Sequence, residues 1–174
     1  MMNLRRRLQC RLGFTLIEAM IVIAIVAIMS AIAIPYYGGF IDNRDLKSAA
    51  RDIAGDIFEM KERAIAEDRY YQITFNQGAS SYTMHQCAVG DTQLPCITGT
   101  DIITKSPSAF KNDIVISAVN LPAGNVIQLL PRGIINPAGN ANGNITLRNS
   151  RGSRATITIS LTGRASVDWT GTIQ

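Results

Sequence analysis

Hydrophobic residues follow three successive patterns along the chain. Residues 14–34 form a continuous apolar run in which Glu18 is the only charged residue. Between residues 46 and 64 apolar residues recur every three or four positions, and from residue 70 short stretches alternate between apolar and polar residues. These patterns predict a membrane-spanning helix, an amphipathic helix and a series of β-strands.

The apolar run is long enough to cross a bilayer. A helix of 21 residues is about 30 Å long, which matches the hydrocarbon core. A carboxylate costs about 2.5 to 3.5 kcal/mol at the centre of such a helix and less near its end, so we expect Glu18 to have a function. Four arginines precede the run, and basic flanks stay in the cytoplasm, so the chain beyond residue 35 is expected on the outer side.

The amphipathic pattern predicts that the helix continues to about residue 67. Its apolar stripe consists of Leu46, Ala50, Ile53, Ile57, Met60 and Ala64. Pro35 lacks an amide hydrogen, and Gly38 and Gly39 follow within a turn, so we expect a kink or local melting between about residues 31 and 39. The alternative is that a membrane helix simply ends there.

The alternating segments predict strands in the last hundred residues. They are residues 70–75, 82–87, 114–116, 126–130, 144–147, 155–161 and 165–169. The first two are expected to form a hairpin, and residues 131–143 a loop. The chain is therefore expected to have an α+β fold, in which one long N-terminal helix packs through its second half on an antiparallel β-sheet domain.

The N-terminus has three interpretations. A secretory signal peptide cleaved after Ala33 fits a small-x-small site, but the apolar run exceeds the usual 7 to 15 residues and carries Glu18. A lipoprotein signal at Cys10 fits less well, because the apolar run follows the cysteine. The third interpretation comes from residues 13–18, Gly-Phe-Thr-Leu-Ile-Glu, which follow a short basic leader and open the apolar helix.

These six residues resemble the class III signal of type IV pilins and type II secretion pseudopilins. The resemblance implies that a prepilin peptidase cleaves between Gly13 and Phe14, N-methylates Phe14 and leaves the helix in the mature protein. It also implies that Glu18 of an incoming subunit pairs with the terminal amine of an assembled one. Residues 157–164 further resemble the FimT and GspH branch of the family.

The resemblance implies a minor pilin or pseudopilin with a pilin-like fold. Its parts would be a cleaved leader (1–13), a transmembrane and filament-core helix (14–34), the helix continuation (35–68) and a β-rich outer domain (69–174). The implied partners are prepilin peptidase, other major and minor subunits, the inner-membrane assembly platform and membrane lipid. The implied location is the bacterial inner membrane, crossed once, with the C-terminal domain in the periplasm and later in a filament. A type IV pilus and a type II secretion pseudopilus use the same leader and helix, so both remain open.

The net charge of +4 belongs to the leader, because the residues after it carry 13 basic and 13 acidic side chains. Within this neutral part, residues 42–68 have a net charge of −3 and residues 126–174 one of +4. Four arginines, Arg148, Arg151, Arg154 and Arg164, supply most of the positive charge and could neutralise phosphates.

Some FimT-like pilins are DNA receptors, so a DNA-binding minor pilin is the alternative function. The other explanation is that these arginines solvate a hairpin and protect its edge. The sequence Gly163-Arg164-Ala165-Ser166 lacks the second arginine of the Gly-Arg-x-Arg pattern found in DNA-binding relatives.

Cysteine and histidine residues offer little catalytic chemistry. Cys87 and Cys96 are expected to form a disulfide in an oxidising compartment, worth about 2 to 3 kcal/mol. His85 would add a third metal ligand, but no convincing fourth one is present. One histidine with scattered serines and aspartates does not make a nucleophile and base pair, and neither a phosphate loop nor a dinucleotide motif occurs. We therefore expect no enzyme, cofactor or metal site.

Overall fold

The computed structural model describes residues 14–121, 123–136 and 142–170, and only the backbone of residues 33–37. The described residues form one α-helix, eight strands and one 3-10 turn. These are α1 (Leu16–Glu67), β1 (Tyr71–Asn76), β2 (Ser81–Cys87), β3 (Gly99–Lys105), η1 (Pro107–Ala109), β4 (Val115–Asn120), β5 (Val126–Leu129), β6 (Gly143–Arg148), β7 (Arg154–Ile159) and β8 (Ala165–Thr170). The chain divides into two units, residues 1–38 and 39–174, which are considered separately below.

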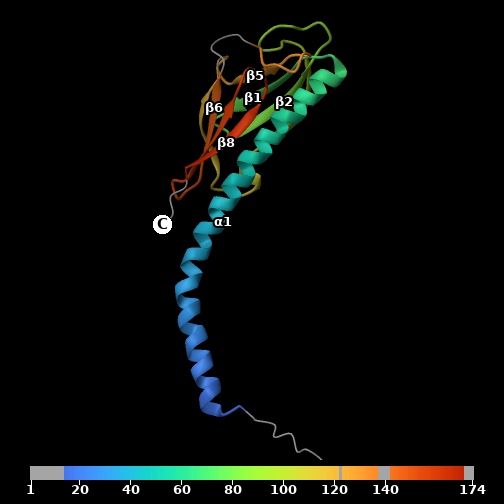
Figure 1. Ribbon diagram of the computed structural model, residues 1–174. Coiled ribbons are helices and arrows are strands. Elements are labelled where there is room, and N and C mark those ends of the chain that lie inside the picture. Colours follow the sequence, from blue (N-terminus) through green and yellow to red (C-terminus); the bar gives the residue numbers. More distant parts are fainter. Residues whose placement is uncertain (1–13, 122, 137–141, 171–174) are drawn as a thin grey trace, which may run out of the picture. The chain divides into compact units, whose positions relative to one another are not determined.

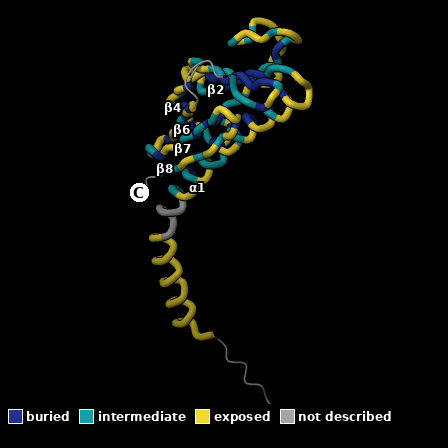
Figure 2. The backbone as a smooth tube through the Cα atoms, turned by 45° about the horizontal axis from the view of Figure 1, so that its top comes forward, coloured by how far each residue is buried: buried dark blue, intermediate teal, exposed yellow. Residues whose placement is uncertain are grey.

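The first unit contains the start of α1. Thr15 precedes the helix, and its hydroxyl accepts a hydrogen bond from the Glu18 amide at 3.3 Å. Thr15 is therefore an N-cap that satisfies one of the free amides of the first turn. Residues 14–32 are exposed throughout (Figure 2). Within the described part of the chain, no helix contains an apolar stretch long enough to cross a membrane.

In the second unit, the remainder of α1 covers a hydrophobic core. The predicted stripe is confirmed, since all six of its residues are no more than 1% exposed. They pack with buried residues of both sheets, including Ile73, Leu147 and Ile157. The 3.6-residue period of the helix thus determines which face meets the strands.

The strands form two antiparallel four-stranded sheets, with the orders β3-β2-β1-β5 and β4-β6-β7-β8. Figure 1 shows the sheets beside the second half of α1. Hairpins connect β1 to β2, β6 to β7 and β7 to β8, whereas β1 pairs with the distant β5. Alternate residues of β6 and β7 are buried, as expected for strands with one face on a core.

Three sequence expectations need correction. Helical structure continues through residues 31–39, so the local melting considered there is absent, while the kink stays a prediction. Strand β3 was not predicted. Its first six residues are exposed, so it lacks the alternating pattern that reveals a half-buried strand, and pairing with β2 alone defines it. The sheet expected as one unit is also divided into two.

Candidate functional sites

The residues expected at the processing and assembly site lie at the start of the described chain. Gly13 lies outside the described residues, Phe14 is 80% exposed, and Glu18 lies in the first turn of α1. Thr15 and Glu18 have the spacing of a capping box, a helix-start signal that our sequence analysis missed. The helix thus begins two residues after the expected cleavage site, so cleavage there would leave its first turn intact.

The exposed surface of this segment is almost entirely apolar. Its large exposed side chains are Leu16, Ile17, Met20, Ile21, Val22, Ile23, Ile25, Val26, Ile28, Met29 and Ile32. Soluble monomers rarely expose continuous apolar surface of this extent, so the segment requires a lipid or protein partner.

Cys87 and Cys96 form a disulfide, with Cα atoms 5.7 Å apart. The loop between them is ordered around Asp91, whose carboxylate accepts hydrogen bonds from the amides of Gln93, Ile97 and Thr98. The hydrogen bond from the Thr98 amide is the main cause that lowers the pKa of Asp91, followed by that from Gln93. The disulfide and this carboxylate together fix a surface loop that has no regular secondary structure.

His85 does not form a metal centre with these cysteines. Its Nδ1 lies 2.8 Å from an oxygen of Asp101 on β3, and both cysteine sulfurs are used in the disulfide. Among the described residues, no group of histidine, cysteine, aspartate and glutamate side chains is arranged to hold a metal ion.

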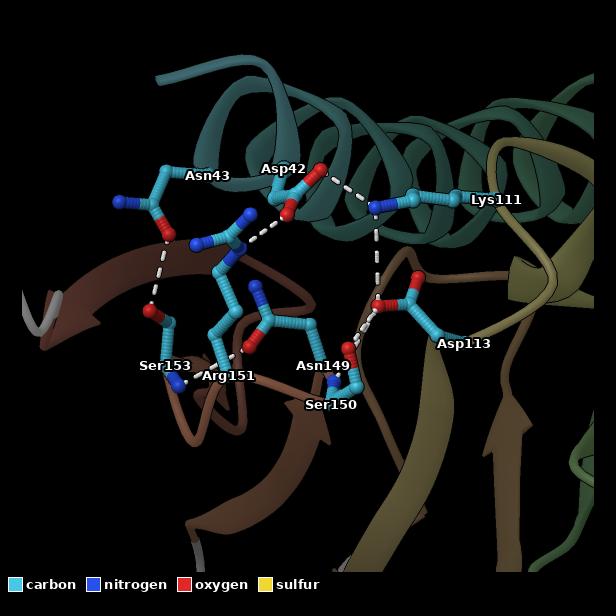
Figure 3. Close-up of polar contacts among 8 residues, drawn as sticks. All are labelled: Asp42, Asn43, Lys111, Asp113, Asn149, Ser150, Arg151 and Ser153. Atoms are coloured by element: carbon cyan, nitrogen blue, oxygen red, sulfur yellow. Dashed lines mark hydrogen bonds and ion pairs between the residues drawn. The ribbon is translucent and has the colours of Figure 1, made fainter. Parts of the chain in front are cut away.

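An ionic cluster connects α1 with the β6–β7 turn and with the segment before β4 (Figure 3). Asp42 accepts hydrogen bonds from both Lys111 and Arg151, and Lys111 lies 3.7 Å from Asp113. The hydrogen bond from Lys111 and that from Arg151 lower the pKa of Asp42, although its burial acts in the opposite direction. The hydroxyl of Ser150 donates to Asp113 at 2.5 Å and is the main cause that lowers the pKa of Asp113.

A second ion pair lies against the core. Asp56 is 5% exposed and accepts hydrogen bonds from Lys105 at 2.7 Å and from the Tyr82 hydroxyl at 2.6 Å. Burial would lower the pKa of Lys105, but the hydrogen bond and charge of Asp56 outweigh it and raise this pKa. Burial and the same carboxylate raise the pKa of Tyr82. These contacts give Asp56 a counter-charge and hydrogen bonds where α1 packs against the sheet β3-β2-β1-β5.

The four arginines proposed for DNA binding do not form one patch. Arg148 and Arg154 lie directly opposite each other on β6 and β7, and both are exposed. Arg151 lies in the connecting turn, where it pairs with Asp42. Arg164 lies in the turn before β8, at the other end of β7. The structure thus brings three of them to one end of the second sheet, and one of these three has an internal counter-charge.

Comparisons with known proteins agree with this architecture. The prokaryotic N-terminal methylation motif matches residues 8–34, and the family "Type II transport protein GspH" matches residues 49–163. A comparison with curated proteins found no match. Among solved structures, the minor pilin FimU of Pseudomonas aeruginosa has 12% identity and a TM-score of 0.54, and the alignment covers 74% of this chain and 92% of FimU.

The minor pseudopilin EpsH of Vibrio cholerae gives a similar result. Its identity is 12% and its TM-score 0.51, with 73% of this chain and 97% of EpsH covered. At these identities the two structures establish a shared fold and nothing more specific.

Proposed function

The chain belongs to the GspH family of type II transport proteins, and from this premise we propose that it is a minor subunit of a type IV pilus or a type II secretion pseudopilus. The observation that carries the proposal is the methylation motif over residues 8–34, which includes the exposed apolar segment at the start of α1, where Glu18 is the only charged residue. A capped helix with such a surface fits a filament core, where neighbouring helices cover it.

The proposed maturation creates the contact needed for assembly. Prepilin peptidase cleaves between Gly13 and Phe14 and methylates the new amine, which keeps its positive charge. Glu18 then pairs with the terminal amine of a neighbouring subunit, and this pairing sets the axial position of each subunit. Before assembly, residues 14–34 anchor the chain in the inner membrane and the C-terminal unit lies in the periplasm, within reach of the assembly platform.

Intact-mass measurement of the protein from membranes tests the processing step. We expect a mature chain that begins with N-methylated Phe14. The variant Gly13→Leu should accumulate as full-length precursor, because a bulky side chain replaces the small residue before the scissile bond, whereas a matched change in the leader, Gln9→Leu, should be processed normally. A mature chain beginning at Ile34, or an uncut one, would contradict the proposal.

DNA binding is the second candidate function. The observation that favours it is the position of Arg148 and Arg154, since like charges placed directly opposite on neighbouring strands repel each other. A bound phosphate would relieve that repulsion, and the exposure of both side chains leaves them accessible. Its test is described at the end of the Discussion.

A further inference from the structure

A basic groove lies between α1 and β8 in the C-terminal unit. It has a volume of about 570 Å³ and is lined by Phe40, Asn43, Arg44, Lys47, Ser48, Arg51 and Trp169. The three cationic residues are spaced by three and four positions, which places them along one face of the helix. We call this feature the α1–β8 groove.

Among the described residues that line the groove, none has an acidic side chain. In the part of the chain that the structure describes, Arg44, Lys47 and Arg51 form no ion pair, whereas several other cations, such as Lys105, Lys111 and Arg151, do. The ammonium of Lys47 lies over the Trp169 ring, 4.4 Å from its centroid. Neighbouring cations without counter-charge repel one another, so an anionic partner would stabilise this surface.

Phospholipid headgroups are a second class of anionic ligand for this surface. Cross-linking distinguishes the two classes, because a headgroup would give a lipid adduct and a protein partner a cross-linked peptide.

Single-stranded nucleic acid fits the groove poorly. Such ligands use open aromatic faces on which bases stack. Trp169 is half-buried and packs against the core, while Lys47 covers its ring from the groove side. Among the described residues that line the groove, the aromatic side chain that remains well exposed is Phe40, at 66%.

We propose that the α1–β8 groove binds an acidic segment of a neighbouring filament subunit. This inference rests on the proposed function and names a contact within the assembly. The cationic residues of the groove belong to α1, the helix that also contains the exposed apolar segment. Carboxylates of the partner pair with Arg44 and Arg51, and Phe40 supplies an apolar contact at the entrance.

Site-specific photocross-linking in cells that build the filament tests the inference. A photoreactive amino acid replaces Ser48 in the full chain, and the cross-linked peptides are identified by mass spectrometry. We expect an acidic segment of another filament subunit. The reversal Arg44→Glu with Arg51→Glu should lower the yield at least about threefold, since two exposed ion pairs become repulsive. Lys47 is left in place so that its contact with Trp169 is retained.

A matched control and a compensating variant complete the experiment. Arg69→Glu with Arg132→Glu changes the net charge equally outside the groove and should leave the yield unchanged, while Arg44→Lys with Arg51→Lys should preserve it. Changing the acids of the cross-linked segment to lysine should restore the yield of the reversed variant. Formation of the Cys87–Cys96 disulfide in each variant verifies that the domain has folded.

Several outcomes would overturn the inference: cross-links to DNA, to lipid or only to residues 171–174 of the same chain, no cross-link at all, or a yield that charge reversal does not change. If the mature chain is nevertheless found in sheared filaments, only the groove inference fails. If the chain is absent from filaments, the proposed function fails and the inference fails with it.

Discussion

Asp42 is the residue through which α1 holds two segments that lie far away in the sequence. Its carboxylate pairs with Lys111 and Arg151, and these pairs lower its pKa. A carboxyl group whose pKa is lower in the folded state stabilises the fold above its unfolded pKa of about 3.9, and this contribution is lost as the pH falls through the folded value. The pKa of Asp113 is lowered as well, so it acts in the same direction.

We therefore expect the free energy of unfolding of the C-terminal unit to decrease on acidification below about pH 4. Asp42→Asn should lower this free energy at neutral pH by about 1 to 2 kcal/mol, because hydrogen bonds to charged partners are lost. The same variant should also show a smaller decrease of this free energy between neutral and acidic pH. Urea unfolding of the full chain at pH 7 and pH 3 measures both effects, with Asp168→Asn, a change at an exposed position of β8, as the control. Equal acid sensitivity of wild type and Asp42→Asn would contradict this role.

Glu18 is a second single residue with an expected role, in this case in filament assembly. Glu18→Ala should leave the precursor stable and cleaved, because it removes a charge from an apolar segment, but incorporation into filaments should fall strongly. The amount of mature protein in sheared filaments, relative to that in membranes, measures this. Glu18→Asp is the matched variant and should retain part of the function. Normal recovery of Glu18→Ala in filaments would rule out the pairing role.

Single residues also show which features could be predicted from the sequence and which could not. The spacing of apolar residues was sufficient to identify the buried stripe of α1, and residues 13–18 pointed to the family before any geometry was known. The burial of Asp42 and Asp56 could not be predicted, because their partners Lys111 and Lys105 lie 69 and 49 positions further along the chain. Nothing local in the sequence distinguishes these two aspartates from solvated ones.

At the level of elements, the second half of α1 is held by packing against both sheets. Ile57 is fully buried in this interface, and Ile57→Ala should lower the free energy of unfolding by about 2 to 5 kcal/mol through lost burial and a residual cavity. Phe58 follows it on the exposed side and is 59% exposed, so Phe58→Ala should change this free energy by less than about 0.5 kcal/mol. Denaturant unfolding compares the two variants, and similar losses would contradict the packing described here.

The strands show why part of the fold was predictable. Strands β6 and β7 bury alternate residues, and this pattern is visible in the sequence. In contrast, β3 is defined by its backbone hydrogen bonds to the edge of β2 and not by burial, since Ile102 and Ile103 remain partly exposed. The division into two sheets follows from the pairing of β1 with β5, which depends on contacts across about fifty residues and leaves no local signal.

For the molecule as a whole, the Cys87–Cys96 disulfide is expected to matter for stability in an oxidising compartment. The bridge closes a loop with a sequence separation of 9. Its removal in Cys87→Ala with Cys96→Ala should lower the free energy of unfolding by about 2 to 3 kcal/mol, because the unfolded chain gains freedom. Peptide mapping without reduction should find the two cysteines linked, and reductant should not destabilise the double variant further. Free alkylation of both thiols in protein from the periplasmic side would contradict the bridge.

The distribution of the arginines over the molecule determines which of them could contact DNA together. Arg151 is paired with Asp42, and Arg164 lies roughly 20 Å along the strands from Arg154, at the usual rise per residue. Of the four C-terminal arginines, only Arg148 and Arg154 are then expected to contact phosphates at one place, so the logarithmic salt dependence of duplex binding through them should have a slope of about 2. Arg148→Gln with Arg154→Gln should abolish binding, whereas Arg164→Gln should change it little. Titration of the full chain at two salt concentrations measures the slope. If no binding occurs at low salt, or if the double variant binds as well as wild type, the arginines serve only to solvate the hairpin and the structural role in the filament stands alone.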